Sequence, residues 1–241
     1  MHLFKRSIII GLGLTLDKLF LFILPYLLDS GSYNEFNRSY YLAGLIALFA
    51  LLGFNFSIKS VRLKNILIFL LVFINSIASC LIILLFFQKG NFSLFPLVFA
   101  FFGVMITIFQ FEFLFKSEVK KYLIALIYLF TAQVPTVATH IMTGLNLFYA
   151  LTILYGLVFI LILQLINEGE KHSKNDVVAF YTAGLSTFVI NSSPVAILLL
   201  GKYIATVNFT IEIANSYVFA SLLIAPMYFA GNIIERVIYT L

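Results

Sequence analysis

Apolar residues occur along this chain in long runs that are separated by short polar segments. A membrane-spanning helix needs roughly 20 apolar residues, because the hydrocarbon core of a bilayer is about 30 Å thick. Eight runs have about this length and cover residues 7–28, 40–58, 65–87, 94–115, 122–143, 146–166, 177–200 and 211–234. The pattern therefore predicts an all-α fold, a polytopic transmembrane bundle of about eight spans.

The composition supports this interpretation. The 241 residues are 62% hydrophobic and 10% charged, and the mean hydropathy is +1.08. A water-soluble chain of this length has too much surface to cover with so few polar side chains. We therefore expect the protein to fold in a membrane, with lipid as a partner.

The distribution of charge predicts an orientation. If the amino terminus is cytoplasmic and the runs alternate in direction, 11 of the 15 Lys and Arg residues fall on the cytoplasmic side. Three of them, Arg38, Lys89 and Lys202, fall in outer segments, and Lys18 lies within the first run. This bias follows the positive-inside rule, so both termini are expected in the cytoplasm. Because topology explains the basic charge, no nucleic-acid partner is expected.

The polar segments are too short to contain a soluble domain. The longest of them, NEGEKHSKND at 167–176, separates six apolar runs from two. The sequence therefore predicts a first six-helix lobe at 1–167, a cytoplasmic linker at 168–176 and two further helices at 177–241.

Two adjacent charged residues lie inside the first run, Asp17 and Lys18. An ionisable group in the membrane costs about 2.5–3.5 kcal/mol on insertion scales and usually faces a cavity or a partner. Lys18 could therefore offer its ammonium group to an anionic headgroup. The alternative is a structural ion pair, with either Asp17 or Glu112 as the partner.

Other polar residues interrupt the fifth and seventh runs. Gln133 and His140 flank Pro135, which must disturb the hydrogen bonding of a helix backbone. Such a helix could line a pore or relay protons, or His140 could simply form a hydrogen bond between helices. Asn191 lies before Pro194 in a second polar break, where neighbouring hydroxyl groups could instead satisfy the freed carbonyls. These residues complete the candidate substrate-binding set: Lys18, Asp17, His140, Gln133 and Asn191.

Simple structural roles are expected for several further residues. Glu112 and Lys116 have the spacing of a salt bridge within one helix, and Cys80 is expected to pack as a small buried residue. Tyrosines near the ends of the runs are expected to anchor the helices at the membrane surface; they are Tyr40, Tyr41, Tyr122 and Tyr203.

The sequence contains no recognisable catalytic or metal-binding pattern. His2, His140 and His172 lack metal-ligand spacing, and no P-loop or dinucleotide-binding fingerprint occurs. We therefore expect no catalytic residue, no metal site and no cofactor, and a protein that is not an enzyme.

Two segments resemble a known family. The first is LTLDKLFLFILPYLLDSGSYNEFNRSYYLAGLIALFALLGFNFSIKS, in which the step Glu35–Phe36–Asn37 and the turn Leu52–Gly53–Phe54 precede the basic residue Lys59. The second is FVINSSPVAILLLGKY at 188–203. They are similar to the openings of the two halves of bacterial polysaccharide flippases of the O-antigen type. These flippases belong to the multidrug/oligosaccharidyl-lipid/polysaccharide exporter superfamily.

The resemblance implies a function in surface-polysaccharide (lipopolysaccharide) biosynthesis. Such flippases have two six-helix lobes and move an undecaprenyl-diphosphate-linked oligosaccharide across the bacterial inner membrane. Family members have 12 to 14 spans, so this chain would correspond to the first lobe and an incomplete second lobe. We therefore expect either a truncated remnant or a protein that associates with another copy.

Two other functions remain open from the sequence. One is an integral-membrane polysaccharide polymerase or acyltransferase, although those enzymes usually need a larger outer loop. The other is an ion-coupled drug exporter of the same superfamily, for which the acidic residue Asp17 would be important.

Overall fold

The computed structural model describes residues 20–54, 57, 65–87, 93–116, 118–166 and 177–223. All regular secondary structure in these ranges is helical, which confirms the all-α prediction. The long helices are α2 (Ser30–Leu51), α4 (Asn65–Phe87), α5 (Phe95–Phe115), α6 (Val119–Thr143), α7 (Leu147–Leu163) and α8 (Val177–Asn208). Residues 20–27 and Ile211–Leu223 are also helical.

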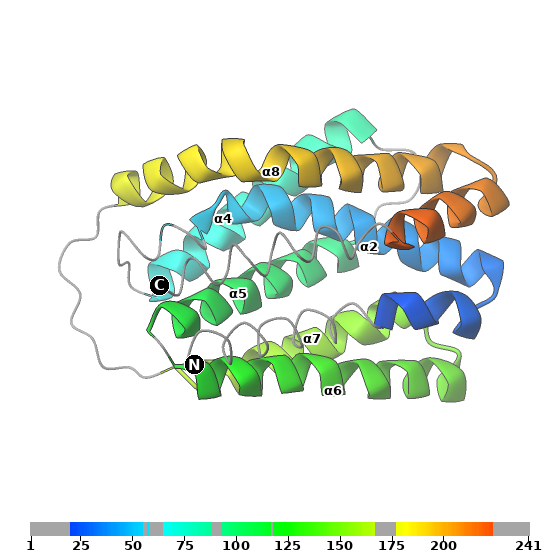
Figure 1. Ribbon diagram of the computed structural model, residues 1–241, viewed down its shortest axis with the longest axis horizontal. Helices are drawn as coiled ribbons and strands as arrows, with labels where there is room; N and C mark the ends of the chain where they lie inside the picture. Colours follow the sequence, from blue (N-terminus) through cyan, green and yellow to red (C-terminus); the bar gives the residue numbers. More distant parts are fainter. Residues whose placement is uncertain are drawn as a thin grey trace.

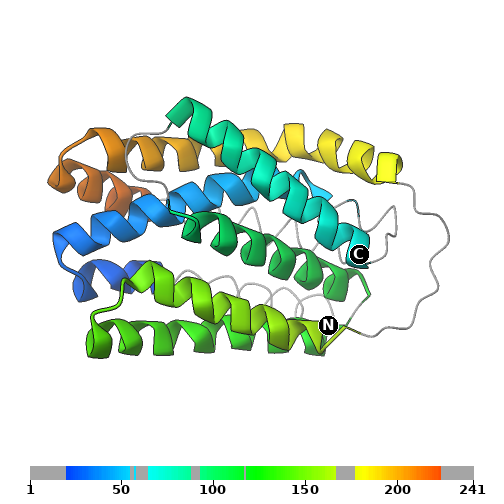
Figure 2. The same cartoon turned by 180° about the vertical axis from the view of Figure 1, so that it is seen from behind.

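The long helices lie side by side in one bundle (Figures 1 and 2). At one end are the turn between α6 and α7 and the end of α8; we call it the Gly144 end. At the other are the connection between α5 and α6 and the end of α7; we call it the Lys116 end (Figure 1). Helix α2 packs against α4, α5, α7 and α8, whereas α6 packs mainly on α7. Helix α2 is therefore the central element.

Four of the apolar runs match the helices closely. The run at 65–87 coincides with α4, and those at 94–115, 122–143 and 146–166 coincide with α5, α6 and α7 to within three residues. Helix α6 ends at Gly144, which has a positive φ of 67° that suits glycine. The gap of only two residues between the runs at 122–143 and 146–166 thus corresponds to a tight turn between α6 and α7.

Two segments that the hydropathy pattern predicts as outer loops are helical in the structure. Helix α2 begins at Ser30, ten residues earlier than the apolar run, because Asp29 caps it: Oδ1 accepts hydrogen bonds from the backbone N–H groups of Gly31 at 2.9 Å and Ser32 at 3.0 Å. Helix α8 continues to Asn208, beyond the predicted end of its run. Average hydropathy missed both extensions because their polar side chains face neighbouring helices.

Among the described residues, two helices, α5 and α6, are long and apolar enough to cross a membrane by length and composition. The described parts of α4, α7 and α8 contribute shorter apolar stretches. The number of spans, their orientation and the division into lobes stay predictions.

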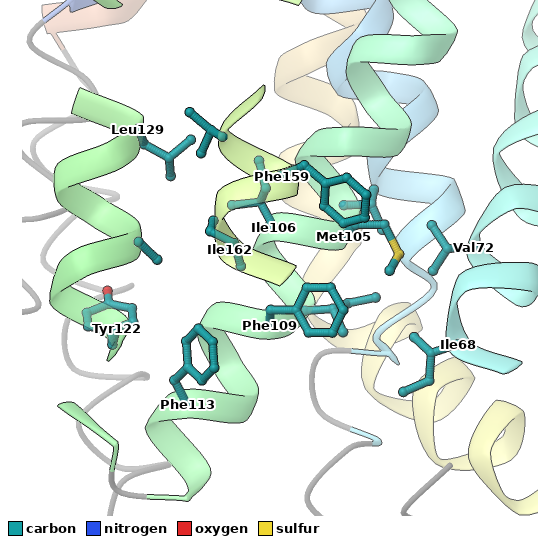
Figure 3. Close-up of a cluster of buried hydrophobic side chains, with 14 of the residues drawn as sticks. Ile68, Val72, Met105, Ile106, Phe109, Phe113, Tyr122, Leu129, Phe159 and Ile162 are labelled. Atoms are coloured by element: carbon teal, nitrogen blue, oxygen red, sulfur yellow. The ribbon is translucent and has the colours of Figure 1, made fainter. Parts of the chain in front are cut away.

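Buried aromatic and aliphatic side chains form the core between the helices. Figure 3 shows the cluster toward the Lys116 end, in which Phe109 of α5 stacks on Phe159 of α7 at 6.4 Å between ring centroids. A second cluster lies toward the Gly144 end and contains Phe36 and Phe148. Cys80 packs in this second cluster, as expected.

The predicted tyrosine anchors are mostly wrong. Tyr41, Tyr122 and Tyr203 are all buried inside the bundle, and only Tyr40 is partly exposed. Their rings face neighbouring helices, and the burial of a residue depends on the helix face that it occupies, even near a helix end as for Tyr122.

Helices α2 and α8 approach most closely where α2 ends. Leu52 and Gly53 both have positive φ, 41° and 72°, and Gly53 faces Gly184 of α8. A Cβ atom added to Gly184 would lie only 2.6 Å from the Leu52 carbonyl oxygen. Close by, the Ser57 hydroxyl donates a hydrogen bond to the Phe180 carbonyl at 2.9 Å. The two helices can therefore approach this closely only because glycine, which has no side chain, occupies both positions.

We expect Gly184→Ala to destabilise the fold, because the added methyl group collides with backbone. Overpacking of this kind costs about 1–3 kcal/mol, which would appear as a lower Tm of the detergent-solubilised protein. Gly103→Ala in α5 is the matched control. Nothing lies within 4 Å of a Cβ atom at Gly103, so alanine should leave the Tm unchanged or raise it. Equal Tm values for the two variants would contradict the close contact.

The N-cap of α2 predicts that the stability of the fold depends on pH. Hydrogen bonds from the Ser32 side chain and backbone, and from the Gly31 backbone, lower the pKa of Asp29. A carboxylate whose folded-state pKa is lowered stabilises the fold above its unfolded-state pKa, and this contribution disappears as the pH falls through the folded-state value. Asp29→Asn keeps a capping side chain without a charge. The Tm advantage of the unmutated chain over Asp29→Asn should be present at pH 7 and vanish in acid. A constant difference would contradict this assignment.

Candidate functional site

Five polar side chains of α2 and α8 are buried in the half of the bundle toward the Gly144 end. Each of them is only 2–6% exposed. We call this set the α2–α8 polar interface; it consists of Tyr33, Asn37, Tyr41, Lys202 and Thr206. In a bundle whose core is otherwise largely apolar, it is the strongest candidate for a functional site.

Helical spacing places the α2 members on one face. Tyr33, Asn37 and Tyr41 are four residues apart, so they lie about 6 Å from one another along the helix axis. Lys202 and Thr206 have the same spacing on α8. The polar segments that the hydropathy pattern predicts as loops therefore belong to continuous helices.

Contacts along α2 and α8 fix their antiparallel register. A Cβ atom at Gly44 would lie 3.3 Å from the Leu199 side chain, and the Lys202 ammonium lies 5.1 Å from the centroid of the Tyr41 ring. One turn further toward the Gly144 end, this register places Asn37 level with Thr206. Beyond α8, Asn215 Nδ2 in the helix Ile211–Leu223 donates a hydrogen bond to the Ser30 carbonyl at 3.0 Å.

Lys202 carries a positive charge into this interface. Lysine is rarely buried so completely unless it is paired, because removing its charge from water costs several kcal/mol. The Tyr41 ring contributes a cation–π interaction of about 0.5–2 kcal/mol. This is too small to offset the burial alone, so other groups must share the charge.

The interface also contains buried polar atoms without partners. Within the part of the chain that the structure describes, neither the Tyr33 hydroxyl nor Asn37 Nδ2 has a hydrogen-bond partner. A buried donor that lacks a partner costs about 1–3 kcal/mol. The Thr206 hydroxyl differs, because it donates to the Tyr203 carbonyl at 2.7 Å. The Tyr33 hydroxyl and the Asn37 amide lie one turn apart on the same buried face of α2.

Two of the sequence-predicted site residues lie on α6. Gln133 is buried, and His140 is partly exposed in the last turn of the helix. They are seven residues apart and share a helix face, whereas the buried lysine lies between α2 and α8. The candidate residues that the structure describes therefore occupy two separate places.

His140 takes part in the turn that follows α6. Its Nδ1 atom lies 2.7 Å from the Leu145 carbonyl oxygen, and its own carbonyl accepts a hydrogen bond from the Gly144 N–H. Next in the turn, Asn146 caps α7 and donates a hydrogen bond to Glu35 of α2 at 2.9 Å. This arrangement ties the α6–α7 turn to α2, and substrate binding by His140 and Gln133 stays a prediction.

The other predicted site residues lie wholly or partly outside the described residues. Asp17 and Lys18 lie outside the described residues. The backbone of Asn191 belongs to α8, but its side chain also lies outside them. The expected helix-end salt bridge is confirmed, since Lys116 Nζ lies 2.8 Å from Glu112 Oε1.

Sequence reasoning missed the α2–α8 polar interface because it assigned Tyr33, Asn37 and Lys202 to outer segments. The four-residue spacing on each side was the signal that could have identified it, together with the capping residue Asp29. No protein-family model, curated protein or solved structure matches the chain. The site must therefore be interpreted from its own chemistry.

Proposed function

We propose that the chain is a polytopic membrane protein with lipid around its bundle. The exposed face of α4, within the part of the chain that the structure describes, supports this proposal. Its exposed large side chains are all apolar: Leu70, Phe73, Ile74, Ile77, Leu81, Ile82 and Leu85. They extend over about 22 Å of helix, most of the thickness of a hydrocarbon core.

Other helices present similar faces. Helix α6 exposes Ile127, Val134, Ile141 and Met142, and α7 exposes Ile153, Leu157 and Ile160. In water, apolar patches of this extent would drive association or aggregation. In a bilayer they are the expected surface, which is why a membrane bundle accounts for them better than the core of a soluble protein.

The orientation follows from charge. Lys116, Lys120 and Lys121 lie around the connection between α5 and α6, so the positive-inside rule assigns the Lys116 end to the cytoplasm. The Gly144 end then faces the outside. Together with the family resemblance, this supports a multi-pass protein of the bacterial inner membrane with both termini in the cytoplasm.

Within this bundle, the function we propose is translocation of an undecaprenyl-diphosphate-linked oligosaccharide. The main support for this proposal is the contrast between the apolar surface of the bundle, which can face lipid, and the polar side chains buried inside the bundle. A lipid tail could remain in the bilayer beside faces such as that of α4 while a charged headgroup crosses among interior polar groups. The resemblance of residues 14–60 to the flippases supplies the choice of cargo.

The proposed topology can be tested with single cysteines in a Cys80→Ala background. Thr210 is exposed after α8 at the Gly144 end, and Gln164 is exposed after α7 at the Lys116 end. With a membrane-impermeant maleimide, Thr210→Cys should react in intact cells, whereas Gln164→Cys should react only after lysis. The reverse pattern, or protection of both cysteines in intact cells, would contradict the proposed arrangement.

Transport can be tested by expressing the chain in a flippase-deficient strain and measuring surface polysaccharide. If Lys18 meets a headgroup, Lys18→Met should lose most of the restored polysaccharide, whereas Lys18→Arg should keep part of it because the charge remains. Lys120→Met, at an exposed lysine of the Lys116 end, is the control and should leave transport unchanged. Failure of the unmutated chain to restore polysaccharide, at a normal level in the membrane, would exclude independent transport.

A further inference from the structure

We propose that two copies of this chain associate in the membrane through helix α6. The contact surface is the exposed face of this helix, which we call the α6 face; it consists of Ile127, Thr131, Val134, Ala138 and Ile141. The proposal goes beyond the translocation of a lipid-linked cargo. It rests on the proposed membrane location of the bundle and on the contacts of α6, and not on what the protein transports.

Helix α6 lies at the edge of the bundle (Figures 1 and 2). It packs on α7 and less extensively on α5, and it is less buried than α5, the other helix that is long and apolar enough to cross a membrane. The residues of the α6 face recur at spacings of four and three, so they form one stripe along about 21 Å of helix. Two helices pack along their length with this spacing. The α6 face therefore has the geometry of a helix–helix contact.

The side chains of the α6 face differ from those of the exposed face of α4. The face of α4 carries large side chains such as Phe73 and Leu81, which suit contact with lipid tails. The middle of the α6 face instead contains Thr131 and Ala138, and both are exposed. In a membrane, small and hydroxyl-bearing residues allow helices to approach closely, because association there depends on packing and hydrogen bonds rather than on hydrophobicity.

Pro135 adds a backbone acceptor to this face. Proline has no N–H group, so the Thr131 carbonyl lacks the hydrogen bond that residue 135 of a helix would normally supply. Thr131 and Pro135 are both exposed, so helical geometry places this carbonyl on the exposed side of α6. The Thr131 hydroxyl donates elsewhere, to the carbonyls of Ile127 at 2.8 Å and Tyr128 at 3.2 Å. Since an unsatisfied carbonyl is costly in hydrocarbon, a donor from a neighbouring helix would stabilise this position.

The position of the donor and the acceptor favours a second copy of the chain as the partner. Both groups belong to Thr131, and a two-fold interface is self-complementary. In two copies that cross the membrane in the same direction, the α6 helices run parallel and Thr131 meets Thr131. Each hydroxyl can then rotate about χ1 and donate to the freed carbonyl of the other copy. No Asp, Glu, Lys or Arg occurs between Ile127 and Ile141, so identical faces meet without charge repulsion.

Oxidative cross-linking of single cysteines in liposomes tests the proposal, in a Cys80→Ala background. Ala138→Cys should form a covalent dimer, because the two-fold axis brings position 138 of the two copies together. Ala78→Cys is the matched control. Ala78 is also an exposed alanine, but it belongs to α4, so this variant should remain monomeric. Equal yields of dimer at the two positions, or no dimer with Ala138→Cys, would overturn the proposal.

Energy transfer between labelled copies of the full chain measures the strength of association as the protein is diluted with lipid. Ala138→Leu should weaken the dimer about tenfold or more, because a large side chain separates the helices. Thr131→Val keeps the shape of threonine without the hydroxyl, so it should weaken the dimer about threefold or more. Ala78→Leu should associate like the unmutated chain. Unchanged association of folded Ala138→Leu, with a Tm like that of the unmutated chain, would place the contact elsewhere and overturn the proposal.

The outcomes also separate this interface from the proposed function. A chain that dimerises through α6 but fails to restore surface polysaccharide would remove the transport function and leave the α6 interface standing. A chain that inserts into liposomes and stays monomeric at every ratio of protein to lipid would overturn the α6 interface alone. A chain that does not insert would contradict the membrane location on which both proposals depend.

Discussion

The close contact between α2 and α8 constrains the rest of the molecule. At the Lys116 end it depends on Gly53 and Gly184, where backbone meets backbone and no side chain fits. Twelve residues earlier on α2, about 18 Å along the helix, Tyr41 meets Lys202. With both ends of the contact fixed, every side chain between them has a defined neighbour. This register brings the polar residues of two separate chain segments to one interface.

The surroundings of that interface give it its chemical character. Aromatic clusters fill the bundle on either side, and apolar side chains cover its outer faces. Charge and unpartnered donors have stronger effects in such low-dielectric surroundings than in water. The same surroundings make the charge of Lys202 costly to bury. An apolar exterior around a bundle that contains buried polar groups is the pattern expected of a helical membrane protein.

Much of the fold could be predicted from the hydropathy of the sequence, but the buried polar residues could not. Runs such as 65–87 are long and uniformly apolar, so their helices were evident. The start of α2 and the end of α8 were missed because average hydropathy treats polar residues as exposed, whereas Asn37 and Lys202 are buried. Burial of a polar residue depends on the helix that faces it, and composition does not contain that information. Tyr122 and Tyr203 were misplaced as membrane anchors for the same reason.

The register of α2 against α8 is the central claim, and cysteine cross-linking tests it most directly. In a Cys80→Ala background, Gly44→Cys should pair with Leu199→Cys through a short bifunctional thiol reagent, because a Cβ atom at Gly44 would lie 3.3 Å from the Leu199 side chain. Gly44→Cys combined with Ile197→Cys is the control, since Ile197 is 73% exposed. The account predicts efficient cross-linking of the first pair and little of the second. Equal cross-linking, or preference for the Ile197 pair, would contradict it.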